Sequence, residues 1–180
     1  MKQFSYAVTL AAALTSAGLL TVSRAQAQGI CGDEVTAGGW VVTGPETTSN
    51  FGLNGGVKDT VLLQGQLDFV HAETDCHVFG PLVDYNKPGE FVLVDEFEQC
   101  EGETCRQLIY DVTIQLDGAT VDGTAYVVVC DNGEGLNAEP DTFSIAVVND
   151  VTGELEVDCS VECTELVGGD VQLHVYGRCP

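Results

Sequence analysis

Eight cysteines constrain this 180-residue chain more than any other feature of its sequence. They are Cys31, Cys76, Cys100, Cys105, Cys130, Cys159, Cys163 and Cys179. An even number of cysteines in an exported chain is typical of a disulfide framework, and a thiolate metal site is the competing interpretation. Structural zinc sites commonly use C-x-x-C pairs, whereas the short spacings here leave four residues between Cys100 and Cys105 and three between Cys159 and Cys163. We therefore expect up to four disulfides.

The first 27 residues have the layout of a secretory signal peptide. Lys2 supplies the positive start, an apolar run covers 6–22, and Ala25-Gln26-Ala27 forms a small-x-small cleavage site. A retained membrane anchor is the alternative, but Thr, Ser and Gly interrupt the run, and no second run approaches the roughly 20 residues needed to span a bilayer. We expect a single soluble domain over 28–180, without membrane insertion. We expect it to be secreted to the extracellular space or cell surface, with the periplasm as the alternative.

The charge balance excludes some partners. The chain has 28 acidic and six basic residues, for a net charge of -22, and 44% of its residues are hydrophobic. Cleavage after Ala27 would remove Lys2 and Arg24 and no acid, which leaves four basic and 28 acidic residues and a mature charge of -24. Nucleic-acid binding needs clustered Lys and Arg, so we expect no nucleic-acid partner. The hydrophobic content is too high for an acidic disordered chain.

Apolar residues recur at every second position, which is typical of half-buried strands. The clearest runs are 61–71 and 108–117. Weaker runs of the same kind cover 40–43, 76–84, 90–97, 124–130, 142–148, 154–159 and 171–176. In the run 154–159, the alternation predicts that Cys159 points inward.

Turn residues separate these runs. The predicted turns and loops are Asn54-Gly55-Gly56, Lys87-Pro88-Gly89, Asp117-Gly118, Asp122-Gly123 and 149–153. No stretch has a sustained helical stripe of apolar residues. The sequence therefore predicts an all-β fold, an antiparallel β-sandwich or barrel of about nine to ten short strands, stapled by disulfides.

The disulfide pairing is one hypothesis among the 105 connectivities that eight cysteines allow. Chain ends often lie close together, which favours Cys31 with Cys179. Proximity in sequence favours Cys100 with Cys105 across an acidic tip, and a bridge between apolar strands favours Cys76 with Cys130. Cys159 and Cys163 then remain as the fourth pair, which requires the chain to turn at 160–162.

Two acidic segments could bind a cation. Calcium prefers six to eight oxygen ligands, and the segment 131–141 offers Asp131, Asn132, Glu134 and Asp141. The spacing differs from the D-x-D-x-D-G pattern, and Asp-Asn-Gly is also ordinary turn chemistry, which is the favoured interpretation. The second segment, 95–105, is interpreted as a solvated, cross-linked acidic loop rather than a cation site. We expect no other cofactor.

The histidines and the single tryptophan are further candidate site residues. His71, His77 and His174 could in principle hold zinc, but nothing in the sequence brings them together. Trp40 could be a platform for a sugar ring, and its competing interpretation is a side chain that caps the core. No G-x-S-x-G, H-E-x-x-H or similar catalytic pattern occurs, so we expect no enzyme.

Seven short motifs together resemble the post-COAP-1 domain, a secreted β domain of bacterial extracellular proteins. They are 35–41 (VTAGGWV), 50–53 (NFGL), 65–69 (GQLDF), 76–78 (CHV), 131–134 (DNGE), 141–145 (DTFSI) and 168–174 (GGDVQLH). The resemblance covers roughly 34–175. It implies a secreted β domain of unknown, non-enzymatic function.

The sequence predicts a secreted, acidic, disulfide-stabilised structural or adhesion-type module without catalytic activity. The alternative function is a carbohydrate- or calcium-binding module. Its partners would be an extracellular glycan or another extracellular protein, and its oligomeric state stays open.

Overall fold

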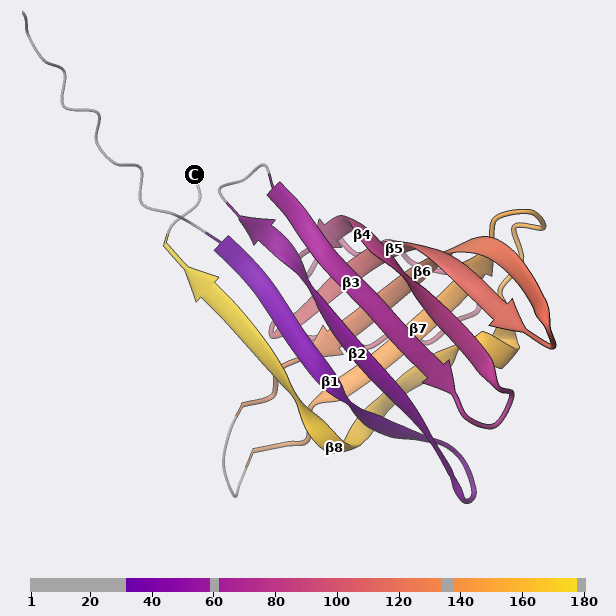
Figure 1. Cartoon of the computed structure of the whole chain (residues 1–180). Helices are drawn as coiled ribbons and strands as arrows, with labels where there is room; N and C mark the ends of the chain where they lie inside the picture. Colours follow the sequence, from indigo (N-terminus) through magenta and orange to yellow (C-terminus); the bar gives the residue numbers. More distant parts are fainter. Residues whose placement is uncertain (1–31, 59–61, 134–137, 178–180) are drawn as a thin grey trace, which may run out of the picture.

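The computed structural model describes residues 32–58, 62–133 and 138–177. These residues form eight β-strands that follow one another around a closed antiparallel barrel, with β8 paired back onto β1 (Figure 1). The strands are β1 (Gly32–Gly44), β2 (Thr47–Lys58), β3 (Leu62–His71), β4 (Cys76–Asn86), β5 (Cys105–Leu116), β6 (Ala119–Cys130), β7 (Thr142–Asn149) and β8 (Val161–Tyr176). The all-β antiparallel prediction is confirmed, and the barrel is the form that the chain adopts.

The long strand β8 closes the barrel by changing partner along its length. Its first residues, Val161 to Glu165, pair with β7, and residues 166–176 pair with β1. In Figure 1 this yellow strand curves from the far sheet to the near one. Closure removes the unpaired strand edges that would otherwise offer a template for aggregation.

Apolar side chains fill the barrel interior because inward positions alternate with outward ones along each strand. Three aromatic rings lie at its centre: the ring centroid of Phe143 is 4.1 Å from that of Phe51 and 5.9 Å from that of Phe69. All three side chains are buried. The interior of this barrel is therefore a hydrophobic core, and the surfaces that can meet a partner lie on its outside.

A buried polar cluster closes one end of this core. Arg106 of β5 donates two hydrogen bonds to the Asp33 carboxylate of β1, at 2.9 and 3.1 Å, and the Tyr85 hydroxyl of β4 donates to the same carboxylate. Lys87 adds an ion pair at 3.4 Å. Burial alone would raise the pKa of Asp33, but the hydrogen bonds from Arg106 and Tyr85, together with the charges of Arg106 and Lys87, hold it below its ordinary value.

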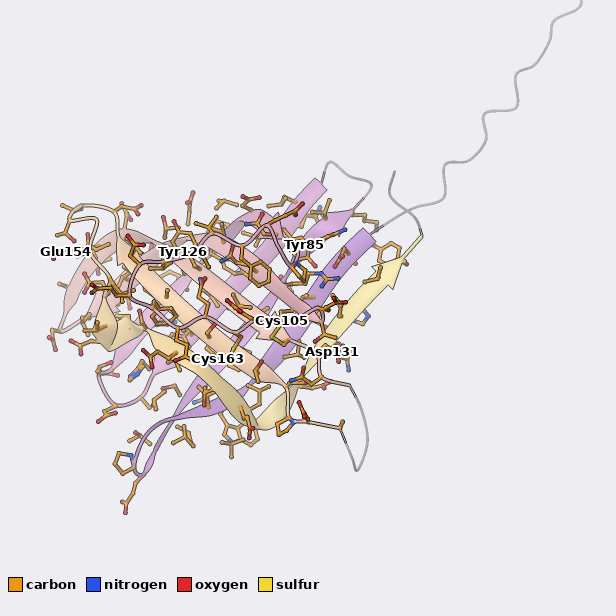
Figure 2. All side chains as sticks on the ribbon, turned by 180° about the vertical axis from the view of Figure 1, so that it is seen from behind. Tyr85, Cys105, Tyr126, Asp131, Glu154 and Cys163 are labelled. Carbon is orange, nitrogen blue, oxygen red and sulfur yellow. A yellow bond between two sulfur atoms is a disulfide. The ribbon has the colours of Figure 1, made fainter. Side chains whose placement is uncertain are left out.

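Residues 87–104, which we call the strap, cross the outside of the barrel over β5, β6 and β7 (Figure 2). The buried Gln107 side chain holds both backbone groups of Val92, each at 2.8 Å. The Cys100 amide donates to the Ser144 hydroxyl of β7 at 3.2 Å. The prediction of a strand over 90–97 is therefore wrong, because a side chain rather than a neighbouring strand binds this backbone.

Three disulfides join the described cysteines, in a pattern that differs from the predicted one. Cys76 pairs with Cys159, Cys100 with Cys163, and Cys105 with Cys130. The predicted pairs Cys76–Cys130, Cys100–Cys105 and Cys159–Cys163 are wrong because the fold, not the sequence spacing, decides which cysteines meet. The predicted pair Cys31–Cys179 lies outside the described residues.

Each disulfide has a distinct structural role. Cys105 and Cys130 face each other across β5 and β6. Cys100–Cys163 pins the strap to β8, and Cys76–Cys159 ties β4 to the segment that precedes β8. Such bonds persist in oxidising compartments, which agrees with an exported protein. Among the described residues, no helix is long and apolar enough to cross a membrane.

Three local predictions also differ from the structure. Segment 154–159 contains an isolated bridge at Leu155 and the short helix η1 (Val157–Cys159) rather than a strand, although Cys159 is buried as expected. The predicted turns at Asn54-Gly55-Gly56 and Asp122-Gly123 lie inside β2 and β6. Their inward-facing glycines make room for packing: a Cβ on Gly55 would lie 2.5 Å from Leu108, and one on Gly123 would lie 2.5 Å from Ile114.

Candidate functional site

The outer face of β8, β1, β2, β3 and β4 carries two adjoining hollows, which we call the outer groove. The larger has a volume of about 660 Å³, and its outward-facing lining residues include Asn54, Gln66, Asp68, His77, Phe79 and Pro81. The smaller, of about 250 Å³, reaches Glu34, Thr36, Gln64 and His174. Asn54 lines both hollows, so the groove runs diagonally across five neighbouring strands.

Gly52 forms the floor of the larger hollow. Gly38, Gly52 and Asp68 lie side by side on β1, β2 and β3, so two of these three outward positions carry no side chain. A Cβ built on Gly52 meets no heavy atom within 4 Å, and this position is exposed. The hollow is therefore open here because glycine occupies an outward strand position at which even a Cβ atom would meet no neighbour.

The wall on β3 and β4 combines a carboxylate, an imidazole and an aromatic ring. Asp68 faces Phe79 across the two strands, and His77 Nε2 lies 3.0 Å from Asp68 Oδ1. The centroids of the His77 and Phe79 rings are 4.8 Å apart. The side chains of His77 and Asp68 remain 36% and 70% exposed, so this wall presents both polar atoms and a ring to a ligand.

Uncharged polar groups line the middle of the groove. Asn54 and Gln66 are paired residues on β2 and β3, and Asn54 Oδ1 accepts a hydrogen bond from the Gln66 backbone amide at 2.9 Å. Further along, Thr36 Oγ1 and His174 Nε2 are 3.3 Å apart. Side-chain amides and hydroxyls both donate and accept hydrogen bonds. This surface can therefore bind ligand groups that are donors and acceptors at once.

Lys and Arg are missing from the described lining of the groove. The Lys and Arg residues that the structure describes are Lys58, Lys87 and Arg106. Lys87 and Arg106 bind Asp33, and Lys58 is the last residue of β2. Glu34 and Asp68 give the groove an acidic rim, which disfavours anionic ligands.

Trp40 lies on the outside of β1, one outward position beyond Gly38. The residue is 43% exposed and its ring covers Gly168 of β8, where an added Cβ would lie 2.2 Å from the ring. The interpretation of Trp40 as a cap on the core is therefore wrong. The prediction that its ring serves as a ligand platform stays a prediction, and its exposure beside the groove is compatible with that role.

Two of the predicted calcium residues, Asp131 and Asp141, accept hydrogen bonds from backbone amides, and the Asn132 side-chain amide donates to the Pro140 carbonyl at 2.7 Å. Asp141 accepts hydrogen bonds from the amides of Asn132 and Val171, each at 2.8 Å. Asp131 accepts from the amides of Gly133 and Leu173, each at 3.0 Å. Through Val171 and Leu173, these carboxylates bind the part of β8 that extends past the end of β7. Glu134 lies outside the described residues, and calcium binding stays a prediction.

The histidines occupy three different places in the barrel. His71 is the buried last residue of β3. Burial lowers its pKa and outweighs the negative charges of Glu73 and Asp158, which raise it. His77 binds Asp68, and His174 lies on β8. Within the described ranges, no three His, Cys, Asp or Glu residues are grouped so that they could hold a metal ion.

The acidic segment 95–105 belongs to the strap rather than to a hairpin tip. Its Glu98, Glu101 and Glu103 are exposed, as expected for a solvated loop. The cross-link that holds it is Cys100–Cys163, and Cys105 begins β5.

Comparison with known proteins supplies no relative. No protein-family model matches the chain, and neither the curated proteins nor the solved structures that were compared give a significant match. The resemblance to the post-COAP-1 domain therefore stays a prediction.

Sequence reasoning missed the groove. The run 61–71 predicted the strand that carries Gln64, Gln66 and Asp68, but the residues after Leu53 were interpreted as a loop. The available signal was the alternation in Asn50-x-Gly52-x-Asn54, in which polar or glycine positions alternate with Phe51 and Leu53. Once that segment is recognised as a strand, these positions share its outer face.

Proposed function

We propose that this protein is a secreted, non-catalytic, adhesion-type module that holds an extracellular partner in the outer groove. The observation that carries the proposal is the groove itself: a hollow of about 660 Å³, built on β-strands and lined by exposed polar side chains and the half-buried ring of Phe79. Binding sites of this kind are typically concave and combine apolar surface with a few placed polar groups.

The rest of the molecule supports an extracellular role. Three disulfides cross-link the barrel and its strap, and the chain carries a net charge of -22. Disulfide frameworks belong to oxidising compartments, and a high net charge keeps a protein soluble. The resemblance to the post-COAP-1 domain implies the same class of protein.

The proposal is tested with labelled protein (residues 28–180, disulfides intact) added to cells and extracellular matrix of the producing organism. We expect retention on this material, and we expect Gly52→Trp to lose it, because the indole fills the groove. The matched control is Thr120→Trp, which places the same side chain at an exposed position of β6. Equal retention of both variants would contradict the proposal, as would hydrolysis of a glycan or peptide panel by the wild-type protein.

A further inference from the structure

The hydrogen-bonding groups of the outer groove match those of hydroxyl groups. Asn54, Gln66 and Thr36 each present both a donor and an acceptor, and all three are exposed. A sugar hydroxyl also donates and accepts, so neighbouring hydroxyls can pair with one side-chain amide. The carboxylate of Asp68 adds acceptor atoms at the edge of the same hollow.

The wall at β4 supplies an apolar surface beside these polar groups. Phe79 is half-buried and packs against His77, and Pro81 is exposed on the same strand. Aromatic side chains present a large, rigid apolar face, which suits the C–H face of a sugar ring. A ligand with alternating polar edges and apolar faces fits this combination better than a uniformly polar one.

The charge of the groove selects against anionic ligands. Its described lining contains Glu34 and Asp68 and neither Lys nor Arg. The whole chain adds a net charge of -22, so sulfated and uronic-acid polymers would meet repulsion both at long range and in contact. The ligand is therefore uncharged or cationic, and the amide-rich lining favours an uncharged one.

The extent of the groove indicates a chain rather than a single sugar. It crosses from His174 on β8 to Phe79 on β4, which spans four gaps between neighbouring strands, or roughly 19 Å at about 4.8 Å per gap. A chain of several sugar residues can contact both hollows at once.

From these observations we infer that the outer groove binds a neutral polysaccharide chain, a conclusion that rests on the proposed function and names its ligand class. Asn54 and Gln66 bind hydroxyls at the centre, Phe79 packs against a ring face, and Asp68 is held in place by His77. Gly52 is the position that determines whether the chain can enter, because any side chain there would occupy its path.

The test is affinity electrophoresis of the protein in gels that contain single polysaccharides. The neutral probes are β-glucan, mannan and dextran, the anionic probe is alginate, and soluble chitosan oligosaccharides serve as the cationic probe. We expect retardation by at least one neutral polymer, unchanged by added salt, and none by alginate. Gly52→Trp should weaken this binding by about a hundredfold, and Gln66→Ala and Phe79→Ala by about tenfold each, whereas Thr120→Trp should bind like the wild type.

The variants are chosen so that misfolding cannot explain a loss. A Cβ at Gly52 meets open space and a glycine inside a strand is itself destabilising, so Gly52→Trp should unfold at the same urea concentration as the wild type or higher. Full binding by Gly52→Trp, or salt-sensitive binding to chitosan alone, would overturn the inference. Failure of all neutral polymers with groove-dependent retention on cells would also overturn it and leave the proposed function standing. If the protein neither binds a neutral polymer nor is retained on cells, both the inference and the proposed function are refuted.

Discussion

At the scale of single residues, Asp33 shows how the barrel accommodates charge inside its core. Its side chain is 7% exposed, yet it accepts two hydrogen bonds from Arg106 and one from Tyr85. A buried charge is tolerated when its partner and its hydrogen bonds are present, and it is costly when one of them is removed. The cluster therefore fixes β1, β4 and β5 relative to one another at this end of the barrel.

Removal of one partner tests this account. We expect Arg106→Met to lower the free energy of unfolding by about 3–5 kcal/mol, because it leaves Asp33 buried without its main counter-charge. Lys87→Met should cost less than about 1 kcal/mol, because Lys87 is largely exposed. Urea unfolding of the two variants measures the difference, and equal costs would contradict the account. The double variant Asp33→Asn/Arg106→Met should recover part of the loss.

The same carboxylate predicts a dependence on pH. The pKa of Asp33 is lower in the folded state than the value of about 3.9 of an unfolded chain. Its contribution to stability is therefore complete above the unfolded value and lost as the pH falls through the folded one. Over the acid range, the free energy of unfolding of Asp33→Asn should change less steeply with pH than that of the wild type. Parallel curves would show that Asp33 does not take part.

At the scale of elements, Asp131 and Asp141 replace a missing strand neighbour. Because the pairing of β7 with β8 ends at Thr142, the amides of Val171 and Leu173 bind these carboxylates instead. We expect Asp141→Ala to cost about 1–3 kcal/mol, since it leaves buried or half-buried amides without an acceptor. Thermal unfolding with and without millimolar calcium measures this cost. A cost seen only with calcium, and not with magnesium, would instead support the predicted calcium site.

The strap depends on one disulfide for its attachment to β8. Cys100–Cys163 closes a loop of 63 residues, and the chain-entropy model gives such a bond about 4 kcal/mol. We expect Cys100→Ala/Cys163→Ala to remain folded but less stable, with faster amide exchange in 91–104 and on the faces of β6 and β7 beneath it. Unchanged exchange on those strands would show that the strap does not protect them.

The strands were predictable where their pattern was strong, and the disulfides were not. The runs 61–71 and 108–117 correspond to β3 and β5 because both alternate cleanly. The predicted turns at Gly55 and Gly123 are wrong because these glycines allow close packing inside strands. The pair Cys105–Cys130 was within reach, since each cysteine lies 12 residues from the turn Asp117-Gly118 that joins β5 to β6. The other two pairs depend on the closed barrel and the strap, which local patterns do not specify.

The candidate site was harder to predict because its members lie on five strands. Trp40 and the acidic segments are distinctive in the sequence alone. Asn54, Gln66 and Phe79 are common residue types with no distinctive motif around them. Only the register of the barrel places them in one groove. Gly52 contributes to the groove because it has no side chain to fill the hollow, and a sequence pattern alone does not reveal such a hollow.

At the scale of the whole molecule, the net charge of -22 should destabilise the compact state at low ionic strength through self-repulsion. Added salt screens this repulsion, as the Debye length falls from about 30 Å at about 0.01 M to about 10 Å at about 0.1 M. We therefore expect the melting temperature to rise between these two conditions. A flat or falling melting temperature would contradict this expectation.

In the proposed function, this acidic, disulfide-stapled barrel recognises a neutral polysaccharide on the outer groove. Two-dimensional amide NMR spectra, recorded while oligosaccharides of β-glucan, mannan or dextran are added, test it most directly. We expect shifts confined to 34–38, 50–54, 64–68, 77–81 and 172–174, with the strap and β6 unchanged. Shifts centred on the strap or on β6, or no shifts with any of the three, would contradict it.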